Sequence, residues 1–332
     1  MSNLAMMMGL GSGAGGVDVA DVFSTDLYTS DGNNRDVVNG VDLAGEGGLV
    51  WFKLRNLSGD HALYDTERGV LKTLSSNSSG SESTQSNSLT AFNSDGYSIG
   101  TSGYVNYSSG YDYVSWAFKK QTSFFDIVTY SGTGNAGLTI NHALGSVPGM
   151  IIIKSYDDTR DWAVYHRGVD ATNPEDYALV LQQTVAREDN VTWFNDTAPT
   201  ATQFTVGNKL DINRSGKNYV AYLFAHNEDL IQCGSYTGDD LDDGPEIDLG
   251  WKPQWLLVKN ASSSRNWVLV DNKRGISDVN AGDKLLFPNT TAAEDPANGI
   301  TLTSTGFKCD TGGDNFNGSG HTMIYVAIKA ED

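Results

Sequence analysis

Three stretches of the chain alternate between apolar and polar side chains with a period of two residues. They read SGYDYVSWAFKK from Ser109, SGKNYVAYLFAHN from Ser215 and SGHTMIYVAIKAED from Ser319. Because successive side chains of a strand point to opposite faces, this alternation predicts a β-strand with one buried face in each stretch. The Ser-Gly pair that opens each stretch predicts a turn, since glycine adopts the positive φ angles that many turns require.

The face expected to be buried carries large apolar side chains in all three strands. It consists of Val114, Trp116 and Phe118 in the first strand, Val220, Tyr222 and Phe224 in the second, and Ile324, Val326 and Ile328 in the third. We expect each strand to be the last strand of one β-sandwich, with this face in the core of that sandwich.

A second kind of apolar segment also recurs three times. The runs GGLVWFK, PGMIIIK and PQWLLVK end at Lys53, Lys154 and Lys259. They repeat at a spacing of roughly a hundred residues, as the alternating strands do, which indicates an internal repeat. Continuous apolar runs bounded by glycine or proline are typical of central strands. The sequence therefore predicts three copies of one β unit.

The turn residues between these segments predict the fold class. About six to eight short strands per copy indicate an all-β protein of three tandem antiparallel β-sandwich domains, jelly-roll or lectin-like. The expected division is an N-terminal anchoring arm at 1–20, the first repeat at 21–122, the second repeat at 123–228 and the third repeat at 229–332. No long linker rich in proline or serine separates the repeats, so we expect them to pack in a row.

The net charge argues against several classes of partner. The chain carries a formal net charge of −19, and such a surface repels the phosphates of nucleic acids and of anionic lipids. No apolar stretch approaches the ~20 residues that a membrane-spanning helix needs. We therefore expect neither nucleic-acid binding nor membrane insertion, and we expect the charge to keep a β-rich assembly soluble.

The first sixteen residues, MSNLAMMMGLGSGAGG, form a short apolar and glycine-rich stretch. Its apolar side chains are Leu4, Met6, Met7, Met8 and Leu10. Because the stretch is short and has no basic region, we do not expect a signal peptide. We expect an arm that becomes ordered against a partner and anchors the protein.

Two stretches match the Gly-x-Gly-x-x-Gly pattern of dinucleotide-binding loops. Their glycines are Gly11, Gly13 and Gly16, and Gly132, Gly134 and Gly137. The pattern binds a dinucleotide only between a strand and a helix of a βαβ unit, and neither stretch has that context. The five histidines also lack the spacing of a zinc site. We expect no cofactor.

Candidate catalytic groups are weak. His61 lies four residues before Asp65, with Glu67 nearby, and such a group is conceivable as an acid–base pair. We place Asp161 and Asn266 at the equivalent positions of the other repeats, so the unit does not require a histidine, and a structural or surface role is favoured. A carboxylate pair for glycoside hydrolysis does not stand out among the many acids. We expect no enzymatic activity.

Two features leave alternatives open. The densest acidic cluster consists of Asp239, Asp240, Asp242 and Asp243. Its spacing departs from an EF-hand loop, so a calcium site at one end of a sandwich and a solvated turn both remain open, with the turn favoured. Cys233 and Cys309 form either a disulfide or two core thiols, and the thiols are favoured because a disulfide-built scaffold carries more cysteines.

An aromatic pair marks a candidate binding loop. The segment NVTWFNDTAPT places Trp193 and Phe194 among polar residues. Loops at the end of a sandwich often carry recognition, and aromatic faces stack on sugars or on a partner protein. We therefore take both side chains as candidates for a surface-binding site, against the alternative that both rings fold back and cover the core.

The repeat motifs resemble a known family. DVFSTDLYTSDGNN, GVDLAGEGGLVWFK, LYDTERGVLKTLSSNSS, NSLTAFNSDGYSIG, YVSWAFKK, FFDIVTYSGTGN, HALGSVPGMIIIK, DWAVYHRG and NYVAYLFAHN look like the repeat modules of virion structural proteins in tailed bacteriophages, especially marine and cyanobacterial ones. The resemblance covers 21–228 well. In 229–332, WKPQWLLVKN and NWVLVDNKRG keep only the skeleton of the motifs.

The resemblance implies a structural role and no catalytic residues. We expect a component of the phage virion, assembled in the host cytoplasm, that forms a short tail fibre or appendage for host-surface attachment. The expected partners are other virion proteins of the tail, the portal-proximal region or the capsid, and a host surface glycan or protein. We also expect a homo-oligomer, most plausibly a trimer. The alternatives are a capsid decoration protein and, less favoured, a glycan depolymerase.

Overall fold

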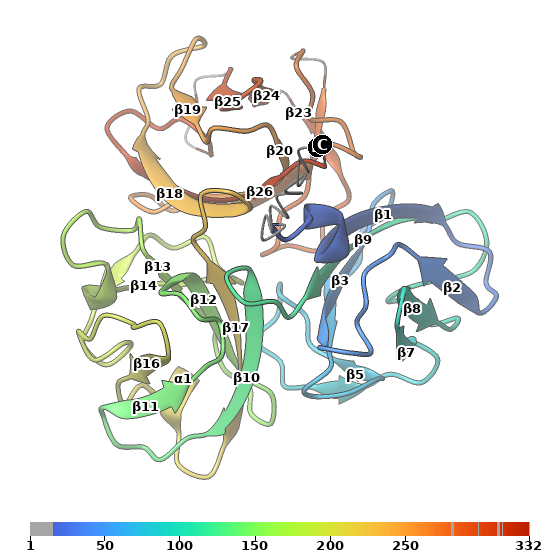
Figure 1. Ribbon diagram of the computed structural model, residues 1–332, viewed down its shortest axis with the longest axis horizontal. Helices are drawn as coiled ribbons and strands as arrows, with labels where there is room; N and C mark the ends of the chain where they lie inside the picture. Colours follow the sequence, from blue (N-terminus) through green and yellow to red (C-terminus); the bar gives the residue numbers. More distant parts are fainter. Residues whose placement is uncertain (1–15, 280–281, 298, 311–312, 314, 332) are drawn as a thin grey trace, which may run out of the picture.

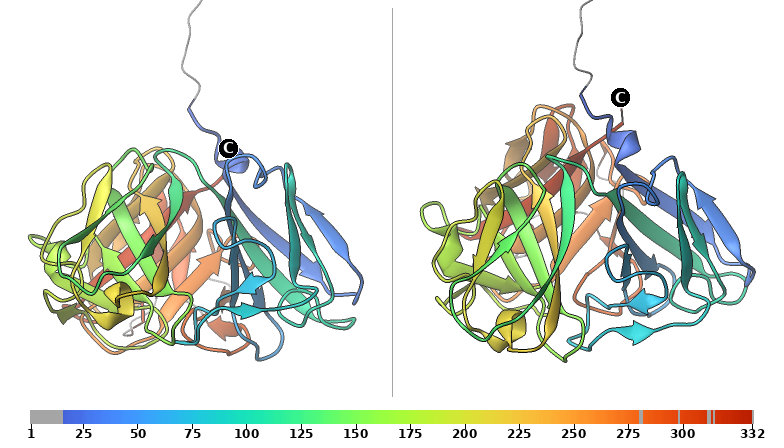
Figure 2. Two further views of the ribbon diagram at one scale, coloured as in Figure 1. Left: turned by 90° about the horizontal axis from the view of Figure 1, so that it is seen from below. Right: turned by 60° about the horizontal axis from the view of Figure 1, so that its bottom comes forward.

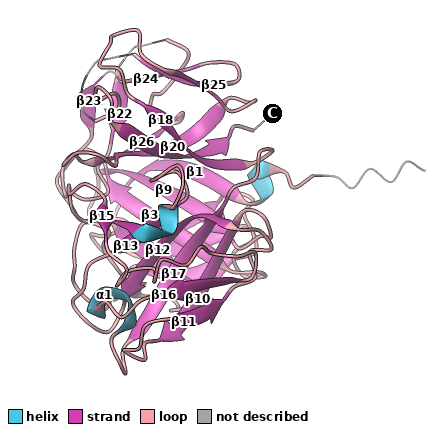
Figure 3. Cartoon of the chain, turned by 90° about the vertical axis from the view of Figure 1, so that its left-hand side faces the viewer, coloured by secondary structure: helices cyan, strands magenta, loops and turns pink. Residues whose placement is uncertain are grey.

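The computed structural model describes residues 16–279, 282–297, 299–310, 313 and 315–331. The protein is all-β with antiparallel sheets, as the sequence predicts, and strands dominate the described part (Figure 3). The helical segments within the described ranges are one turn long: η1 Val19–Asp21, η2 Pro174–Asp176 and α1 Leu210–Asn213. In the part of the chain that the structure covers, no helix has the length and apolar character to cross a membrane.

The first repeat contains nine strands. They are β1 Phe23–Thr29, β2 Arg35–Val38, β3 Gly48–Leu54, β4 Ala62–Asp65, β5 Lys72–Thr73, β6 Ser83–Thr84, β7 Leu89–Asn93, β8 Gly96–Ile99 and β9 Asp112–Lys119. A four-stranded sheet has the order β1-β9-β3-β4, a three-stranded sheet the order β2-β8-β7, and β5 pairs with β6. A hydrophobic cluster with Phe52, Tyr64 and Tyr97 joins the two larger sheets.

The second repeat follows the same plan with an extended inner sheet. Its strands are β10 Phe125–Ser131, β11 Leu138–Asn141, β12 Pro148–Ser155, β13 Ala163–His166, β14 Tyr177–Val180, β15 Glu188–Asp189, β16 Gln203–Val206 and β17 Asn218–Ala225. The large sheet has the order β10-β17-β12-β13-β14-β15, and β11 pairs with β16. The first four strands of this sheet correspond one by one to β1-β9-β3-β4.

The third repeat returns to the four-stranded inner sheet. Its described strands are β18 Ile231–Thr237, β19 Glu246–Asp248, β20 Pro253–Asn260, β21 Trp267–Asp271, β22 Asp283–Leu285, β23 Asp295–Ala297, β24 Ile300–Leu302, β25 Gly306–Cys309 and β26 Thr322–Lys329. The sheets have the orders β18-β26-β20-β21, β19-β25-β24 and β22-β23. A second hydrophobic cluster, with Trp251, Phe307 and Tyr325, fills this repeat.

The predicted repeated strands occupy equivalent places. The Ser-Gly strands are β9, β17 and β26, and the apolar runs are β3, β12 and β20, each paired on both sides within its sheet. Every residue of β3, β12 and β20 is buried, which confirms the prediction of central strands. The turn glycines Gly110, Gly216 and Gly320 have φ angles of 98°, 72° and 70°, as a left-handed turn position requires.

The burial of the alternating strands corrects one expectation. These strands are buried on both faces, not on one, because residues 113–118 of β9 are all buried. Trp116 and Phe118 belong to a central cluster shared by the three repeats. Ala117, on the opposite face, belongs to the cluster inside the first repeat. The face with Trp116 and Phe118 therefore lies between repeats, and the opposite face, which carries Tyr113 and Ala117, is directed to the interior of the first repeat.

The arrangement of the repeats corrects a second expectation. The three repeats close into a ring around a common centre and do not form a row (Figure 1). The third repeat contacts the first directly: the indole Nε1 of Trp116 donates to Oδ2 of Asp271 over 3.0 Å. Seen from the side, η1 and the end of β26 lie on the same side of the molecule (Figure 2). A ring buries all three large apolar faces at once, whereas a row leaves part of this apolar surface exposed to water.

The centre of the ring is an aromatic and aliphatic core. Phe118 of the first repeat lies 5.7 Å from Phe224 of the second and 5.7 Å from Trp255 of the third, measured between ring centroids, and both pairs are edge-to-face. Phe23 lies 6.2 Å from Trp255. Such pairs contribute about 0.5–1.5 kcal/mol each beyond the burial of their area. The three repeats therefore share one core and stabilise one another.

Candidate functional site

Polar contacts at the three junctions between repeats are the most developed chemistry of the described residues. In each large sheet, the next-to-last residue of a central strand is a lysine. These residues, Lys53, Lys154 and Lys259, are all fully buried. Their ammonium groups donate to backbone carbonyls of a neighbouring repeat: Lys53 to Thr291 over 3.1 Å, Lys154 to Ser79 over 3.1 Å, and Lys259 to Thr184 over 2.9 Å. The same contact thus occurs at all three junctions, in one direction around the ring.

Each lysine also bonds a carbonyl of its own repeat. Lys53 donates to Gly59 over 2.8 Å, Lys154 to Ser155 over 2.8 Å and Lys259 to Arg265 over 2.6 Å. Burial lowers the pKa of each of the three ammonium groups to about 8, because a charge in a poorly solvated site is disfavoured. Carbonyl dipoles, not carboxylates, make the direct contacts with these charges.

A ring nitrogen makes a second repeated contact at each junction. The indole Nε1 of Trp162 donates to the carbonyl of Ser75 over 3.1 Å, and that of Trp267 donates to Val180 over 3.1 Å. In the first repeat this place is taken by His61, whose Nε2 lies 3.1 Å from the carbonyl of Phe287. His61 is therefore a member of the junction.

This register corrects the expected alignment of His61. The strand pairing places Phe52 opposite Ala62 and Ile153 opposite Ala163, so His61 corresponds to Trp162 and Trp267, not to Asp161 and Asn266. Its Nδ1 accepts a hydrogen bond from Trp51 over 3.0 Å. Burial lowers the pKa of His61 well below its ordinary value, so the ring is neutral and both of its nitrogens are engaged in structural contacts.

Asp–Arg pairs make a third contact, in which the aspartate accepts a hydrogen bond from a side chain of a neighbouring repeat. Arg274 Nε bonds Asp271 Oδ2 over 2.6 Å in the third repeat, and the same oxygen accepts from Trp116 of the first. Arg68 Nε bonds Asp65 Oδ2 over 2.6 Å, and this oxygen accepts from the hydroxyl of Tyr222 over 2.7 Å. These ion pairs are almost completely buried, so each charge depends on its partner.

The second repeat replaces this pair with a histidine. His166 occupies the place of Asp65 and Asp271 at the end of its strand, and its Nε2 lies 3.0 Å from the carbonyl of Tyr325 in the third repeat. Burial lowers the pKa of His166 to about 3, so a neutral Nε2–H donates to this carbonyl. The junction keeps a buried polar bridge although its chemistry differs.

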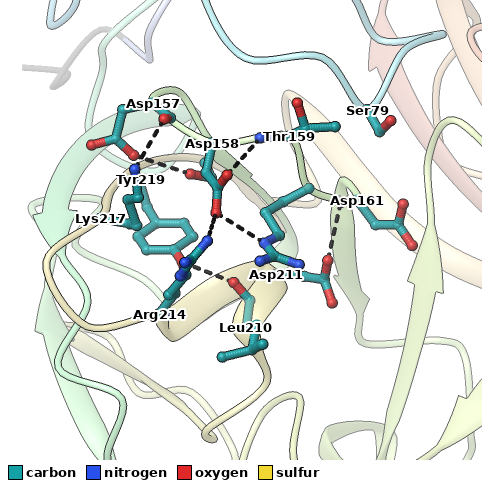
Figure 4. Close-up of polar contacts among 12 residues, drawn as sticks. Ser79, Asp157, Asp158, Thr159, Asp161, Leu210, Asp211, Arg214, Lys217 and Tyr219 are labelled. Atoms are coloured by element: carbon teal, nitrogen blue, oxygen red, sulfur yellow. Dashed lines mark hydrogen bonds and ion pairs between the residues drawn. The ribbon is translucent and has the colours of Figure 1, made fainter.

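A charged cluster lies on the second repeat (Figure 4), and the ammonium of Lys154 lies 3.5 Å from the carbonyl of Asp158 in this cluster. Asp158 accepts from Arg160 over 3.1 Å and from Arg214 over 2.6 Å. The backbone N–H of Asp161 donates to Asp211 over 3.2 Å, and burial, followed by the charge of Asp211, raises the pKa of Asp161. Both arginines pair with Asp158, and these contacts hold the loop that leads from β12 to β13.

The structure contradicts the predicted exposure of the aromatic pair. Trp193 is 1% exposed and Phe194 is 3% exposed. The indole Nε1 of Trp193 donates to Glu188 over 2.9 Å, and Phe194 packs edge-to-face on Tyr165. Both rings fold back over the core, where Glu188 of β15 accepts from the indole and Tyr165 of β13 packs against the phenyl ring. Neither side chain is available as a surface-binding residue.

The acidic cluster of the third repeat is engaged in a turn. Asp239 accepts from the side-chain amide of Asn317 over 2.8 Å and from the backbone N–H of Leu241 over 3.0 Å. Asp243 forms an ion pair with Lys308. Within the described residues, no group of three potential metal ligands comes together. These contacts are those of a hydrogen-bonded turn.

The structure describes part of the predicted N-terminal arm and both cysteines. Leu4, Met6, Met7, Met8 and Leu10 of the expected arm lie outside the described residues. Val19, within the predicted arm at 1–20, is buried in the central core. Cys233 and Cys309 are both buried and free, which confirms the thiols over the disulfide.

The glycine-rich loop of the second repeat has a structural role. It connects β10 with β11, so no helix follows its glycines. The N–H groups of Thr133 and Gly134 donate to the side chain of Asn213 over 2.8 and 3.2 Å. These donors are therefore engaged with the protein itself.

Sequence reasoning missed the junction residues. Lys53, Lys154 and Lys259 served only as markers of the repeat, although one signal was present. A lysine that directly follows an apolar run in every copy lies where a charge is disfavoured unless carbonyls or carboxylates meet it. The same argument applies to the Asp–Arg pairs, whose spacing of three residues recurs in the first and third repeats.

Comparison with known proteins gives a family without an assigned activity. The model of a family described as Domain of unknown function (DUF7483) matches residues 18–332. No curated protein matches the chain. The matched segment runs from η1 through β26, so the family is defined over the whole ring and not over one repeat.

Proposed function

We propose, from the premise that the chain belongs to the DUF7483 family, that this protein is a non-enzymatic structural component of a tailed-phage virion. It forms a short tail fibre or appendage that takes part in host-surface attachment. Its partners are other virion proteins and a host surface glycan or protein. The repeat motifs that resemble virion modules motivate the phage assignment, and the ring geometry supports the structural role.

The observation that carries this proposal is the use of buried polar chemistry. The buried lysines, the buried Asp–Arg pairs and the indole donors bond across junctions between repeats. The loss of one partner of a buried ion pair leaves an uncompensated charge and strongly destabilises the fold. Such contacts therefore permit only one arrangement of the repeats. A ring held in this way is a rigid block, which suits a virion part that must keep its shape.

The finer fold assignment belongs to the same proposal. Each repeat is a small antiparallel β-sandwich of the jelly-roll or lectin-like kind, formed by its large inner sheet and its smaller outer sheet. The clusters around Tyr97 in the first repeat and Phe307 in the third support this division. The outer loops of the sandwiches are then the surfaces that meet the host.

The internal threefold arrangement also favours a second candidate, a capsid decoration protein. Three corresponding inner sheets surround one centre, so a single chain has an approximate threefold arrangement of its backbone. Such a molecule matches a threefold position of a shell without needing three chains. An appendage, by contrast, gains from further oligomerisation, and the homotrimer remains part of the first proposal because repeated weak contacts give avidity.

Counting the protein in purified particles tests these proposals. Quantitative mass spectrometry against isotope-labelled peptides measures the number of copies per particle, and light scattering measures the mass of the isolated protein. Tens of copies or fewer, with a trimeric mass, support the appendage. Hundreds of copies support the decoration protein. A protein absent from the particles contradicts both.

A further inference from the structure

A pocket on the second repeat contains polar groups that the junctions do not use. It has a volume of about 310 Å³ and is lined by Val147, Pro148, Tyr165, Arg167 and Pro174. The lining comes from the start of β12, the end of β13 and the 3-10 helix η2. Two prolines and a valine form its apolar walls, and two hydrogen-bond donors face the same space.

The first donor is the guanidinium of Arg167. Its backbone N–H bonds the carbonyl of Gly149 over 2.9 Å, which fixes the position of the residue. Within the described ranges, its guanidinium forms neither an ion pair nor a hydrogen bond, and its side chain is exposed. Arg68 and Arg274, which follow the equivalent strands, are by contrast buried in ion pairs. Val169 stands at the place of these two arginines, so Arg167 has no counterpart in the junction chemistry.

The second donor is the hydroxyl of Tyr165. The residue is 4% exposed, and its ring packs on Phe194 at 5.7 Å. No hydrogen bond of this hydroxyl exists among the residues that the structure describes. Burial, followed by the charge of Glu175, raises the pKa of Tyr165, so the group stays protonated and donates. The ring is buried, but its hydroxyl is not among the buried groups that lack a partner. Because Tyr165 lines the pocket, the hydroxyl can donate there to a ligand in place of water.

We propose that this pocket binds the carboxylate of an acidic sugar such as a hexuronate, with Arg167 and Tyr165 donating to the carboxylate and the apolar walls covering one face of the sugar ring. The inference rests on the proposed attachment function, since an acidic sugar is a component of host-surface glycans. A guanidinium and a second donor match the two oxygens of a carboxylate.

Glu175 favours a sugar over a simple anion. It follows the lining residue Pro174 in η2, so its carboxylate adds negative charge next to the pocket, which disfavours a simple anion and offers an acceptor to sugar hydroxyls. The net charge of −19 adds a general repulsion of anions. A ligand that carries one carboxylate and several hydroxyls satisfies both the cationic and the acidic groups. Acetate satisfies only the first.

The test is a calorimetric titration of the full-length protein with glucuronate, glucose and inorganic phosphate. We expect saturable binding of glucuronate, at least tenfold weaker binding in Arg167→Gln, and several-fold weaker binding in Tyr165→Phe. Arg214→Gln, at an arginine of the same repeat outside this pocket, is the matched control and retains binding. Circular dichroism melting shows that each variant is folded.

Two results overturn the inference: no binding of glucuronate by the folded wild-type protein, or equal binding by Arg167→Gln. Phosphate binding as strong as glucuronate binding overturns the assignment to a sugar. The readout is independent of the virion proposal. A protein that binds glucuronate but is absent from particles contradicts only the proposed function, and a virion protein without binding contradicts only this inference.

Discussion

Single residues carry the chemistry that closes the ring. Lys53, Lys154 and Lys259 are charged side chains placed at the end of fully buried strands. Each one bonds carbonyls of two repeats, so the neighbouring repeat is part of its solvation shell. A charge is tolerated in such a place only while these carbonyls stay in position. These three lysines are therefore stable in the folded protein only when the neighbouring repeat is in place.

The lysines predict how stability depends on pH. Their pKa is about 8 in the folded protein and 10.5 as the ordinary value. Between these values the unfolded chain binds more protons than the folded chain, so the free energy of unfolding increases as the pH rises from 8 toward 10. Denaturant titrations at a series of pH values measure this slope.

Two lysine variants test whether the buried lysines cause this dependence of stability on pH. Lys259→Met is expected to remove roughly a third of it, because three equivalent lysines contribute and linkage terms add when groups are independent. Lys72→Met, at a side chain that is 41% exposed, is expected to leave the slope unchanged. A slope that is flat in the wild type, or equal in Lys259→Met, contradicts this account of the lysines.

At the scale of elements, the strands were predictable and their neighbours were not. The period-two alternation is local, so it located β9, β17 and β26, and the apolar runs located β3, β12 and β20. The burial of Trp193 and Phe194, which follow β15, could not be predicted from the neighbouring sequence. Trp193 is buried because its indole N–H donates to Glu188 and its ring packs in the core. The polar residues beside it in the sequence do not indicate these contacts. The burial of Trp116 and Phe118 of β9 between repeats likewise depends on the other repeats.

The turn after β21 offers a test of the buried ion pair. Asp271→Ala is expected to lower the free energy of unfolding by about 3 kcal/mol, because it removes the nearest counterion of the buried Arg274 and leaves only the contact with Glu294 at 3.4 Å. It also removes the acceptor of the Trp116 indole. Chemical denaturation followed by circular dichroism measures the loss.

The double variant Asp271→Ala/Arg274→Leu separates an unpaired charge from a lost contact. It is expected to recover part of the loss, since it removes the buried cation as well. Asp36→Ala, at an exposed position of β2, serves as the control and should change stability by less than about 0.5 kcal/mol. A double variant that is no more stable than Asp271→Ala would show that the charge is not the cause.

At the scale of the whole molecule, ring closure was beyond prediction from the sequence. The repeats were visible, and the absence of linkers suggested close packing. The contact between Trp116 and Asp271 joins residues 155 positions apart, and no local pattern specifies that the third repeat returns to the first. The shared core around Phe118, Phe224 and Trp255 makes a row unfavourable, but only the folded arrangement identifies these partners.

Closure predicts cooperative unfolding. Because the three repeats share one core, they are expected to unfold in a single transition, with far-ultraviolet circular dichroism and tryptophan fluorescence giving the same midpoint. The second repeat alone, 123–228, is expected not to fold stably, because the apolar surfaces that contact the first and third repeats are then exposed to water. Separate transitions, or a stable isolated repeat, contradict the shared core.

The central claim, a rigid structural ring of the virion, is tested most directly by cryo-electron microscopy of the intact phage particle that carries this protein. The account predicts that the three-lobed ring fits density in symmetric copies, projecting from the tail or a portal-proximal ring, with its outer loops directed outward. Density that holds the ring on the capsid lattice in hundreds of copies supports the decoration protein and contradicts the appendage. A particle without density for this ring contradicts the account as a whole.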